Sequence, residues 1–146
     1  MDRPKITREL IAAAARKFCE LEGWTEMQAE DLARVCYSPH MNGYDLAKDL
    51  DNLRGWSPTA QDVETLDNFK GYLREAHKQE CIVWARDNNV IPPFPIGTMT
   101  TQGEIVGIFA HDVACYEMRK PDGLDPSWRY IVRFEDACAA PEVVAS

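Results

Sequence analysis

Three prolines within four positions divide this chain into two parts with different hydrophobic patterns. Pro92, Pro93 and Pro95 follow a stretch whose apolar residues recur at helical spacing, and after Gly97 the chain changes to short runs of β-branched and aromatic residues. Helical spacing predicts helices, and such short runs predict strands. Because proline lacks a backbone N–H group and fixes φ, neither a helix nor a central strand continues through this segment. The sequence therefore predicts an α+β fold, with helices before the prolines and a sheet after them.

The same pattern predicts the domain organisation. We expect a helical part over residues 1–90, a proline-rich connector over 91–97, a small antiparallel β-sheet over 98–138 and a flexible tail over 139–146. A polyproline ligand is the alternative for the connector, but such ligands usually lie in low-complexity surroundings. Here the prolines lie between two folded patterns, which favours a stiff connector with Phe94 packed on the sheet.

Capping signals predict four helices before the prolines. The first has Thr7 as N-cap and ends at Gly23, and the second begins at Thr25 and ends before residues 38–40. The third is expected from Asn42 to Gly55, and the fourth from Ser57, with Pro58 in its first turn, to about Asn88. The expected buried stripes are Leu10, Ile11, Ala14, Phe18 and Leu21 in the first helix, Met27, Leu32, Val35 and Cys36 in the second, and Leu46, Leu50 and Leu53 in the third.

The fourth predicted helix is too long for a compact chain of this size. Thirty or so residues at 1.5 Å each give roughly 45 Å, against a diameter of roughly 38 Å for a compact domain. Two solutions remain open: a kink near Gly71, or a projecting second half that packs on another surface.

Three runs after the prolines predict an antiparallel meander. They are "GEIVGIF" at 103–109, "ACYEMR" at 114–119 and "RYIVRFE" at 129–135, with "TMTT" at 98–101 as a possible fourth strand and a turn at 120–127. In the last run Tyr130, Val132 and Phe134 point to one face, which we expect to be the buried one.

Charge and cysteine content restrict the classes of function. Sixteen basic and 24 acidic residues give a net charge of −8, which disfavours nonspecific binding to nucleic acid. DNA binding through the first two helices is disfavoured further, since Arg8, Arg16, Lys17 and Arg34 each lie near an acidic residue. No apolar run is long enough for a membrane span or a signal peptide, and five widely spaced cysteines without a CxxC motif favour reduced thiols. We expect a cytoplasmic protein.

No motif specific for a reaction is present, and no cofactor or metal is expected. The pairs Cys36 with His40 and His111 with Cys115 could supply zinc ligands, but they lack the short knuckle of structural zinc sites. Cys81 lies four residues after His77, as a thiol and its base would on one helical face. Helical spacing produces such neighbours routinely, so the sequence favours a protein without enzymatic activity.

Acidic residues of the third and fourth helices are the candidate partner-binding residues. The set is Asp45, Asp49, Asp62, Glu64 and Asp67, with Asp51 nearby. One interpretation is a solvated face with helix caps, because carboxylates near helix N-termini are favourable. The other is an acidic patch for a basic partner. Trp128, which follows a turn-rich segment, is the candidate aromatic anchor for a partner.

The runs "HMNGYDLAKDLD", "WSPTAQDVETLD", "IPPFPIGTMTTQGEIVGIF", "ACYEMR" and "RYIVRFEDA" resemble a family of small accessory proteins encoded by tailed phages and prophages. The resemblance covers about residues 40–137. It implies a protein that acts in the cytoplasm of a bacterial host, where such proteins often bind and inhibit host machinery, including CRISPR-type defence complexes. The shared runs have a structural character, so the resemblance implies no catalytic residue.

These observations predict a non-enzymatic, phage-encoded binding protein. It would inhibit or modulate a host protein or nucleoprotein complex that has a basic surface, for example as an anti-CRISPR or other counter-defence protein. The alternative is a self-associating accessory protein, a homodimer formed through the long helix. An enzyme dependent on Cys81 and His77 is the less favoured third interpretation.

Overall fold

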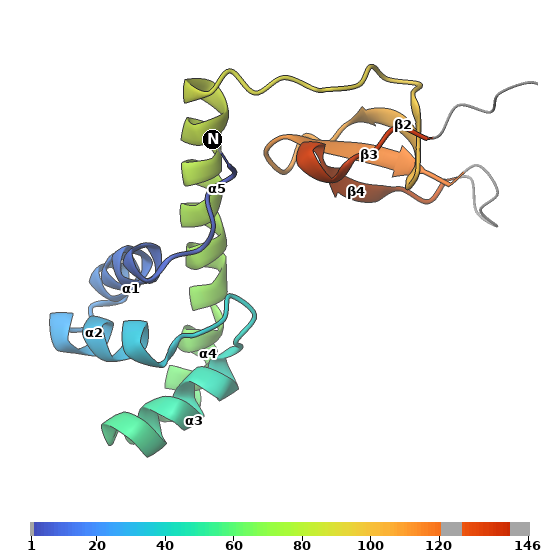
Figure 1. Ribbon diagram of the computed structural model, residues 1–146. Helices are drawn as coiled ribbons and strands as arrows, with labels where there is room; N and C mark the ends of the chain where they lie inside the picture. The colour runs from blue at the N-terminus through green and yellow to red at the C-terminus, as the bar shows by residue number, and fades with distance from the viewer. Residues whose placement is uncertain (1, 121–126, 141–146) are drawn as a thin grey trace, which may run out of the picture. The chain divides into compact units, whose positions relative to one another are not determined.

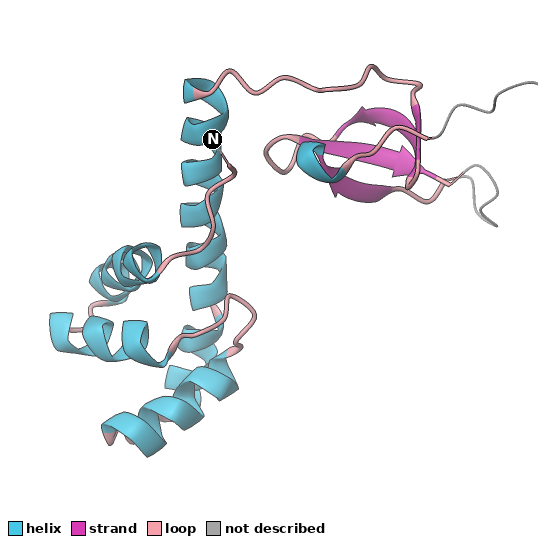
Figure 2. Cartoon of the chain, in the orientation of Figure 1, coloured by secondary structure: helices cyan, strands magenta, loops and turns pink. Residues whose placement is uncertain are grey.

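The computed structural model describes residues 2–120 and 127–140 (Figure 1). The helices are α1 (Arg8–Glu22), α2 (Glu26–Val35), α3 (Gly43–Arg54), α4 (Ala60–Asp67) and α5 (Phe69–Asp87). The strands are β1 (Met99–Thr100), β2 (Gly103–Ile108), β3 (Cys115–Arg119) and β4 (Tyr130–Arg133), followed by the 3-10 turn η1 (Phe134–Asp136). Figure 2 shows that all of these helices precede the strands, which confirms the predicted α+β class.

The chain divides into two compact units. The helical unit consists of residues 2–81, and the sheet unit begins at Ile82, inside α5. The predicted limits of the connector at residues 91 and 97 stay predictions. The predicted turn at 120–127 and the predicted tail at 139–146 lie largely outside the described residues.

Local capping begins the first three helices and ends α1 and α3 as predicted, whereas α2 ends at Val35, so that Cys36 of its predicted stripe is the C-cap. The Thr7 hydroxyl accepts a hydrogen bond from Leu10 N, and Thr25 and Asn42 form reciprocal capping boxes with the residues three positions later. Gly23 and Gly55 end α1 and α3 with φ angles of 75° and 72°, a left-handed conformation that glycine adopts without a steric penalty.

The predicted start of the fourth helix was wrong. The helix begins at Ala60, because Thr59 and Asp62 form a reciprocal capping box, whereas Ser57 is followed three positions later by an alanine without a polar side chain. The only interruption before Asp87 falls at Asn68, between α4 and α5, and not at Gly71. Gly71 lies within α5, and its backbone N–H donates to Asn68 O at 3.1 Å.

Phe18 lies at the centre of the helical core. Its side chain is fully buried, and its ring makes edge-on contacts with Trp24, Phe69 and Tyr72 at centroid distances of 5.6, 5.5 and 5.3 Å. Three residues of the predicted buried stripes are exposed instead: Leu21, Met27 and Leu53. Each lies at the edge of an otherwise correct stripe, where the neighbouring helix no longer covers the side chain.

The sheet is an antiparallel meander in the order β1-β2-β3-β4, so the fourth strand suggested by "TMTT" is confirmed. Its core consists of Ile105, Tyr116, Met118 and Phe134, with Tyr130 and Val132 packed against them, as the alternation predicted. Phe94 also packs on this core, as expected. Its backbone binds the Tyr116 hydroxyl, which accepts from Phe94 N at 2.8 Å and donates to Phe94 O at 3.0 Å. The proline segment is therefore anchored to β3.

The chain after η1 returns to the opposite edge of the sheet. Thr101 N donates to Cys138 O at 2.9 Å, and Ala140 N donates to Met99 O at 3.2 Å, around a bridge between Thr100 and Ala139. This pairing covers the free edge of β1. The sequence analysis did not predict this pairing.

Candidate functional site

Three of the five predicted acidic residues are helix caps. Asn42 N donates to the Asp45 carboxylate at 3.4 Å, and Thr59 N donates to Asp62 at 2.9 Å. Asp67 caps a different helix, since its Oδ1 accepts from Gly43 N at 2.9 Å. Carboxylates in these positions satisfy the unpaired N–H groups at helix N-termini and interact favourably with the helix dipole.

The contact between Asp67 and Gly43 joins α3 to α4. A Cβ atom at residue 43 would lie 2.2 Å from Val63 O and 2.7 Å from Asp67 N, so only glycine allows the two helices to approach this closely. Asp67 also lies 3.9 Å from the Lys70 ammonium. The α3–α4 pair is therefore held by a tertiary cap, and its acidic side chains are presented from a rigid support.

Asp49 and Glu64 have no such structural role. Asp49 is half-buried on α3 and Glu64 is exposed on α4. Within the part of the chain that the structure describes, neither carboxylate forms an ion pair or a hydrogen bond. These two carboxylates are the members of the predicted set that a partner can contact without uncapping a helix.

The charge of the helical unit is unevenly distributed. Residues 26–67, from α2 to α4, contain nine acidic and three basic residues and have a net charge of −6; we call them the acidic segment. The remainder of the helical unit, residues 2–25 and 68–81, contains six acidic and eight basic residues, a net charge of +2. Asp31 of the acidic segment is used internally, since it accepts from Trp56 Nε1 at 3.0 Å and lies 3.6 Å from Arg54 Nε.

Trp128, the predicted aromatic anchor, is 75% exposed and lies two residues before β4. It belongs to the sheet unit, whereas all five candidate carboxylates belong to the helical unit. The predicted partner-binding residues are therefore distributed over both units.

The structure brings Cys81 and His77 together, with 3.6 Å between Sγ and Nε2. The same Nε2 lies 2.8 Å from Pro4 O. Because a carbonyl oxygen can only accept a hydrogen bond, this contact requires a proton on Nε2. In this arrangement Nε2 cannot act as the base that would remove the Cys81 proton.

The two pairs considered for zinc have other contacts. Cys36 Sγ donates to Ser38 O at 3.5 Å, and Cys115 Sγ donates to Val113 O at 3.3 Å. His111 packs edge-on against Phe109. Over residues 2–120 and 127–140, no group of three or more His, Cys, Asp or Glu side chains is arranged to hold a metal ion. Burial also raises the pKa of the Cys36 thiol, which disfavours the thiolate that zinc requires.

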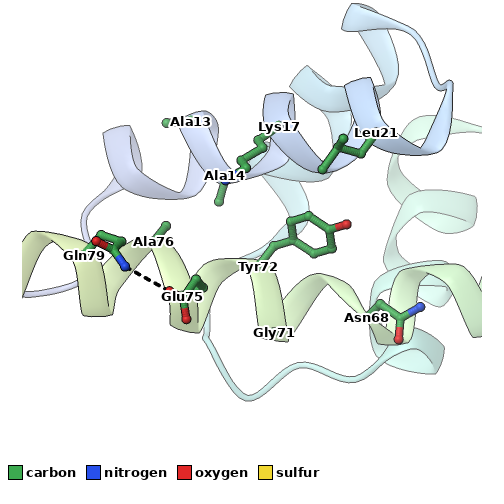
Figure 3. A pocket seen from close by; sticks show the side chains of 10 residues that line it. All are labelled: Ala13, Ala14, Lys17, Leu21, Asn68, Gly71, Tyr72, Glu75, Ala76 and Gln79. Atoms are coloured by element: carbon green, nitrogen blue, oxygen red, sulfur yellow. Dashed lines mark hydrogen bonds between the residues drawn. The ribbon is translucent and has the colours of Figure 1, made fainter. Parts of the chain in front are cut away.

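A groove between α1 and α5 was not predicted. The small residues Ala13, Ala14, Gly71 and Ala76 are among those that line it, and its volume is about 530 Å³. Figure 3 shows the Tyr72 ring between the two helices. Leu21, which lines one end, is 63% exposed. The run of four alanines at 12–15 and the mid-helix glycine were the sequence signals for this groove.

Comparison with protein families, with curated proteins and with solved structures found no match. None of the helices in the described ranges is long and apolar enough to span a bilayer.

Proposed function

We propose that this chain is a non-enzymatic binding protein whose acidic segment contacts a basic surface on a protein or nucleoprotein complex. The observation that carries the proposal is the pair Asp49 and Glu64. These carboxylates form no ion pair within the described residues, and they belong to a segment with a net charge of −6. Charged groups of this kind accelerate association with a complementary surface and fix its orientation.

The support beneath these carboxylates suits a recognition surface. The capping boxes of α3 and α4 and the bond from Gly43 N to Asp67 fix the helices without engaging Asp49 or Glu64. A helix backbone that is already fixed loses less conformational entropy when a partner binds.

The resemblance of residues 40–137 to phage and prophage accessory proteins supports the choice of partner. We infer that the chain acts in the bacterial cytoplasm and inhibits a host defence complex, with a CRISPR effector as the first candidate. The basic channel of such an effector normally receives nucleic acid, and an acidic protein surface can occupy it instead.

The test is inhibition of DNA cleavage by a purified CRISPR effector loaded with guide RNA, as a function of the concentration of this protein. The variant Asp49→Asn/Glu64→Gln removes two charges and retains side-chain size. We expect it to inhibit about tenfold more weakly, a loss of about 1.4 kcal/mol for two ion pairs. Raising the salt concentration should reduce this difference, because salt screens exposed charges.

The matched control is Glu20→Gln/Glu22→Gln, which removes the same charge from exposed positions of α1, outside the acidic segment. The proposal requires the control to inhibit like the parent protein. If both variants inhibited equally weakly, the effect would be due to net charge and not to the acidic segment. If neither variant inhibited more weakly, the acidic segment would not be part of the interface.

A further inference from the structure

We propose that the outer edge of β4 is a docking site for an extended segment of a partner protein in which acidic and β-branched residues alternate. The segment pairs with β4 through its backbone and adds a strand to the meander. This inference is independent of the proposed function, because β4 belongs to the sheet unit and all five candidate carboxylates belong to the helical unit.

The two edges of the sheet differ. Residues 138–140 pair with β1 and cover its outer edge. β4 is the last strand at the other edge, and it pairs with β3 in a continuous register from Tyr130 to Arg133, without a bulge or a proline. Within the described residues, no backbone segment pairs with its outer side. An open edge of this kind is a template for a further strand.

The register identifies the backbone groups that the edge offers. Phe134 N donates to Ala114 O at 3.0 Å, on the side of β3. Because the direction of backbone groups alternates along a strand, Arg133 and Ile131, one and three residues before Phe134, direct their N–H and C=O groups to the outer side. Over residues 2–120 and 127–140 these groups have no hydrogen-bond partner. The edge therefore presents alternating donors and acceptors to an extended chain.

The outer face of this edge is basic. Arg129 and Arg133 flank Ile131 on this face, since side chains alternate along the strand. Arg133 is exposed and forms no ion pair within the described residues. Acidic side chains on an added strand lie beside these arginines and form cross-strand pairs. Antiparallel pairing of two β4 strands about Ile131 places Arg129 opposite Arg133 instead, so like charges disfavour a second copy in this register.

The inner face of the edge is incompletely covered. Tyr116 and Met118 on β3 are fully buried, whereas Tyr130 and Val132 on β4 are half-buried. β-Branched side chains on the inner face of an added strand cover these two residues and extend the apolar core. Because the two faces alternate along a strand, the segment that fits both has acidic and β-branched residues in alternation.

Trp128 offers an aromatic contact near the start of β4. It is the most exposed large apolar side chain in the described ranges, at 75%, and it lies two residues before the strand. Tryptophan is enriched among the residues that dominate binding energy at protein interfaces. A partner segment that extends beyond the first residue of β4 has this ring available.

Fluorescence anisotropy of a labelled peptide of alternating glutamate and valine, titrated with the full chain, tests the proposal. We expect saturable binding. The same peptide with N-methylated amides should not bind, because it cannot donate backbone hydrogen bonds to the edge. A peptide of alternating lysine and valine is the control for charge and should bind about tenfold more weakly.

Ile131→Pro tests the backbone, and Ile131→Ala is its matched control. Both variants remove the isoleucine side chain, but only proline removes the outward N–H group, which the pairing with β3 does not use. Ile131→Pro should bind the glutamate peptide about tenfold more weakly than Ile131→Ala does, because one backbone hydrogen bond is lost. Slow alkylation of buried Cys115 in both variants checks that the sheet is folded.

Arg133→Glu tests the charge at an exposed position and does not alter the core. It should weaken binding of the glutamate peptide about fivefold and strengthen binding of the lysine peptide by a similar factor. No saturable binding of the glutamate peptide, equal binding of its N-methylated form, or no effect of Arg133→Glu would each overturn the proposal. A dimer of the parent that Ile131→Pro dissociates, without peptide binding, would assign the edge to a second copy and overturn it as well.

Discussion

The helical unit and the sheet unit are stabilised by different kinds of contact. The helical unit contains a single cluster of 17 buried residues around Phe18, and capping bonds within three residues define its helix starts. In the described part of the sheet unit the buried core is four residues, Ile105, Tyr116, Met118 and Phe134. Its strands and flanking segments are held by bonds between distant residues, such as Tyr116 to Phe94 and Thr101 to Cys138.

This difference indicates where each unit is vulnerable. Loss of a buried side chain in a large core leaves a cavity and forfeits apolar contacts, so the helical unit should be most sensitive to changes in packing. A small core contributes less, so the sheet unit should depend more on individual buried hydrogen bonds.

The largest effect is expected for Phe18→Ala. This change removes a fully buried ring that contacts three other aromatic rings, and it should reduce the free energy of unfolding of the helical unit by about 3–5 kcal/mol. Alkylation of buried Cys36 during urea unfolding reports on the helical unit, and alkylation of buried Cys115 reports on the sheet unit. Phe18→Ala should lower the urea concentration at which Cys36 becomes alkylated. If the urea concentration for Cys115 fell by a comparable amount, the two units would unfold together.

Alkaline pH should destabilise the helical unit next. Burial raises the pKa of the Cys19 thiol from 9.0 to about 11, with a further contribution from Glu22. The unfolded chain therefore loses this proton first, and stability falls between pH 9 and 11 by up to about 2.7 kcal/mol. Below pH 9 the contribution is fully present. Urea unfolding of Cys19→Ala over this pH range should show a smaller decrease, with a remainder from Cys36, whose pKa burial also raises; a decrease of the same size as in the parent would assign it to groups other than Cys19.

Gly43→Ala should cost about 1–3 kcal/mol, because the added methyl group would clash with the backbone of Val63 and Asp67 and force α3 away from α4. Thermal unfolding followed by circular dichroism measures the loss. If the melting temperature does not change, the close approach of α3 and α4 is not required for stability.

Tyr116→Phe should weaken the sheet unit by about 1–2 kcal/mol, since it leaves the N–H and carbonyl groups of Phe94 without their hydroxyl partner. The shift should appear in the alkylation of Cys115 and not in that of Cys36. Tyr37→Phe, at a residue that is 74% exposed, is the control and should have no effect. Unchanged protection of Cys115 would mean that the proline segment does not depend on this anchor.

Gly71→Ala should produce the smallest change, a gain of about 0.5–1 kcal/mol in the stability of the helical unit. Alanine favours the helix, and its methyl group meets nothing within 4 Å. Thermal unfolding followed by circular dichroism measures this gain. A loss of stability would indicate that the methyl group meets an obstacle inside the helical unit.

The sequence by itself determined the features that depend on near neighbours. The α+β order and the caps at Thr25 and Asn42 arise from residues within three or four positions of one another. The break at the prolines is equally local, because it follows from the missing N–H group and the fixed φ of each proline. Alternation along β4 predicted its buried face for the same reason.

The tertiary structure alone decided which distant groups meet. Asp67 caps a helix that begins 24 residues earlier, residues 138–140 cover the edge of β1, and two helices 46 or more residues apart in sequence form the groove with Leu21 left exposed. Sequence reasoning placed Asp67 in the acidic patch because a carboxylate that caps another helix has the same local pattern as a free one. Contacts between distant residues depend on how whole helices and strands pack, so a short-range sequence pattern does not predict them.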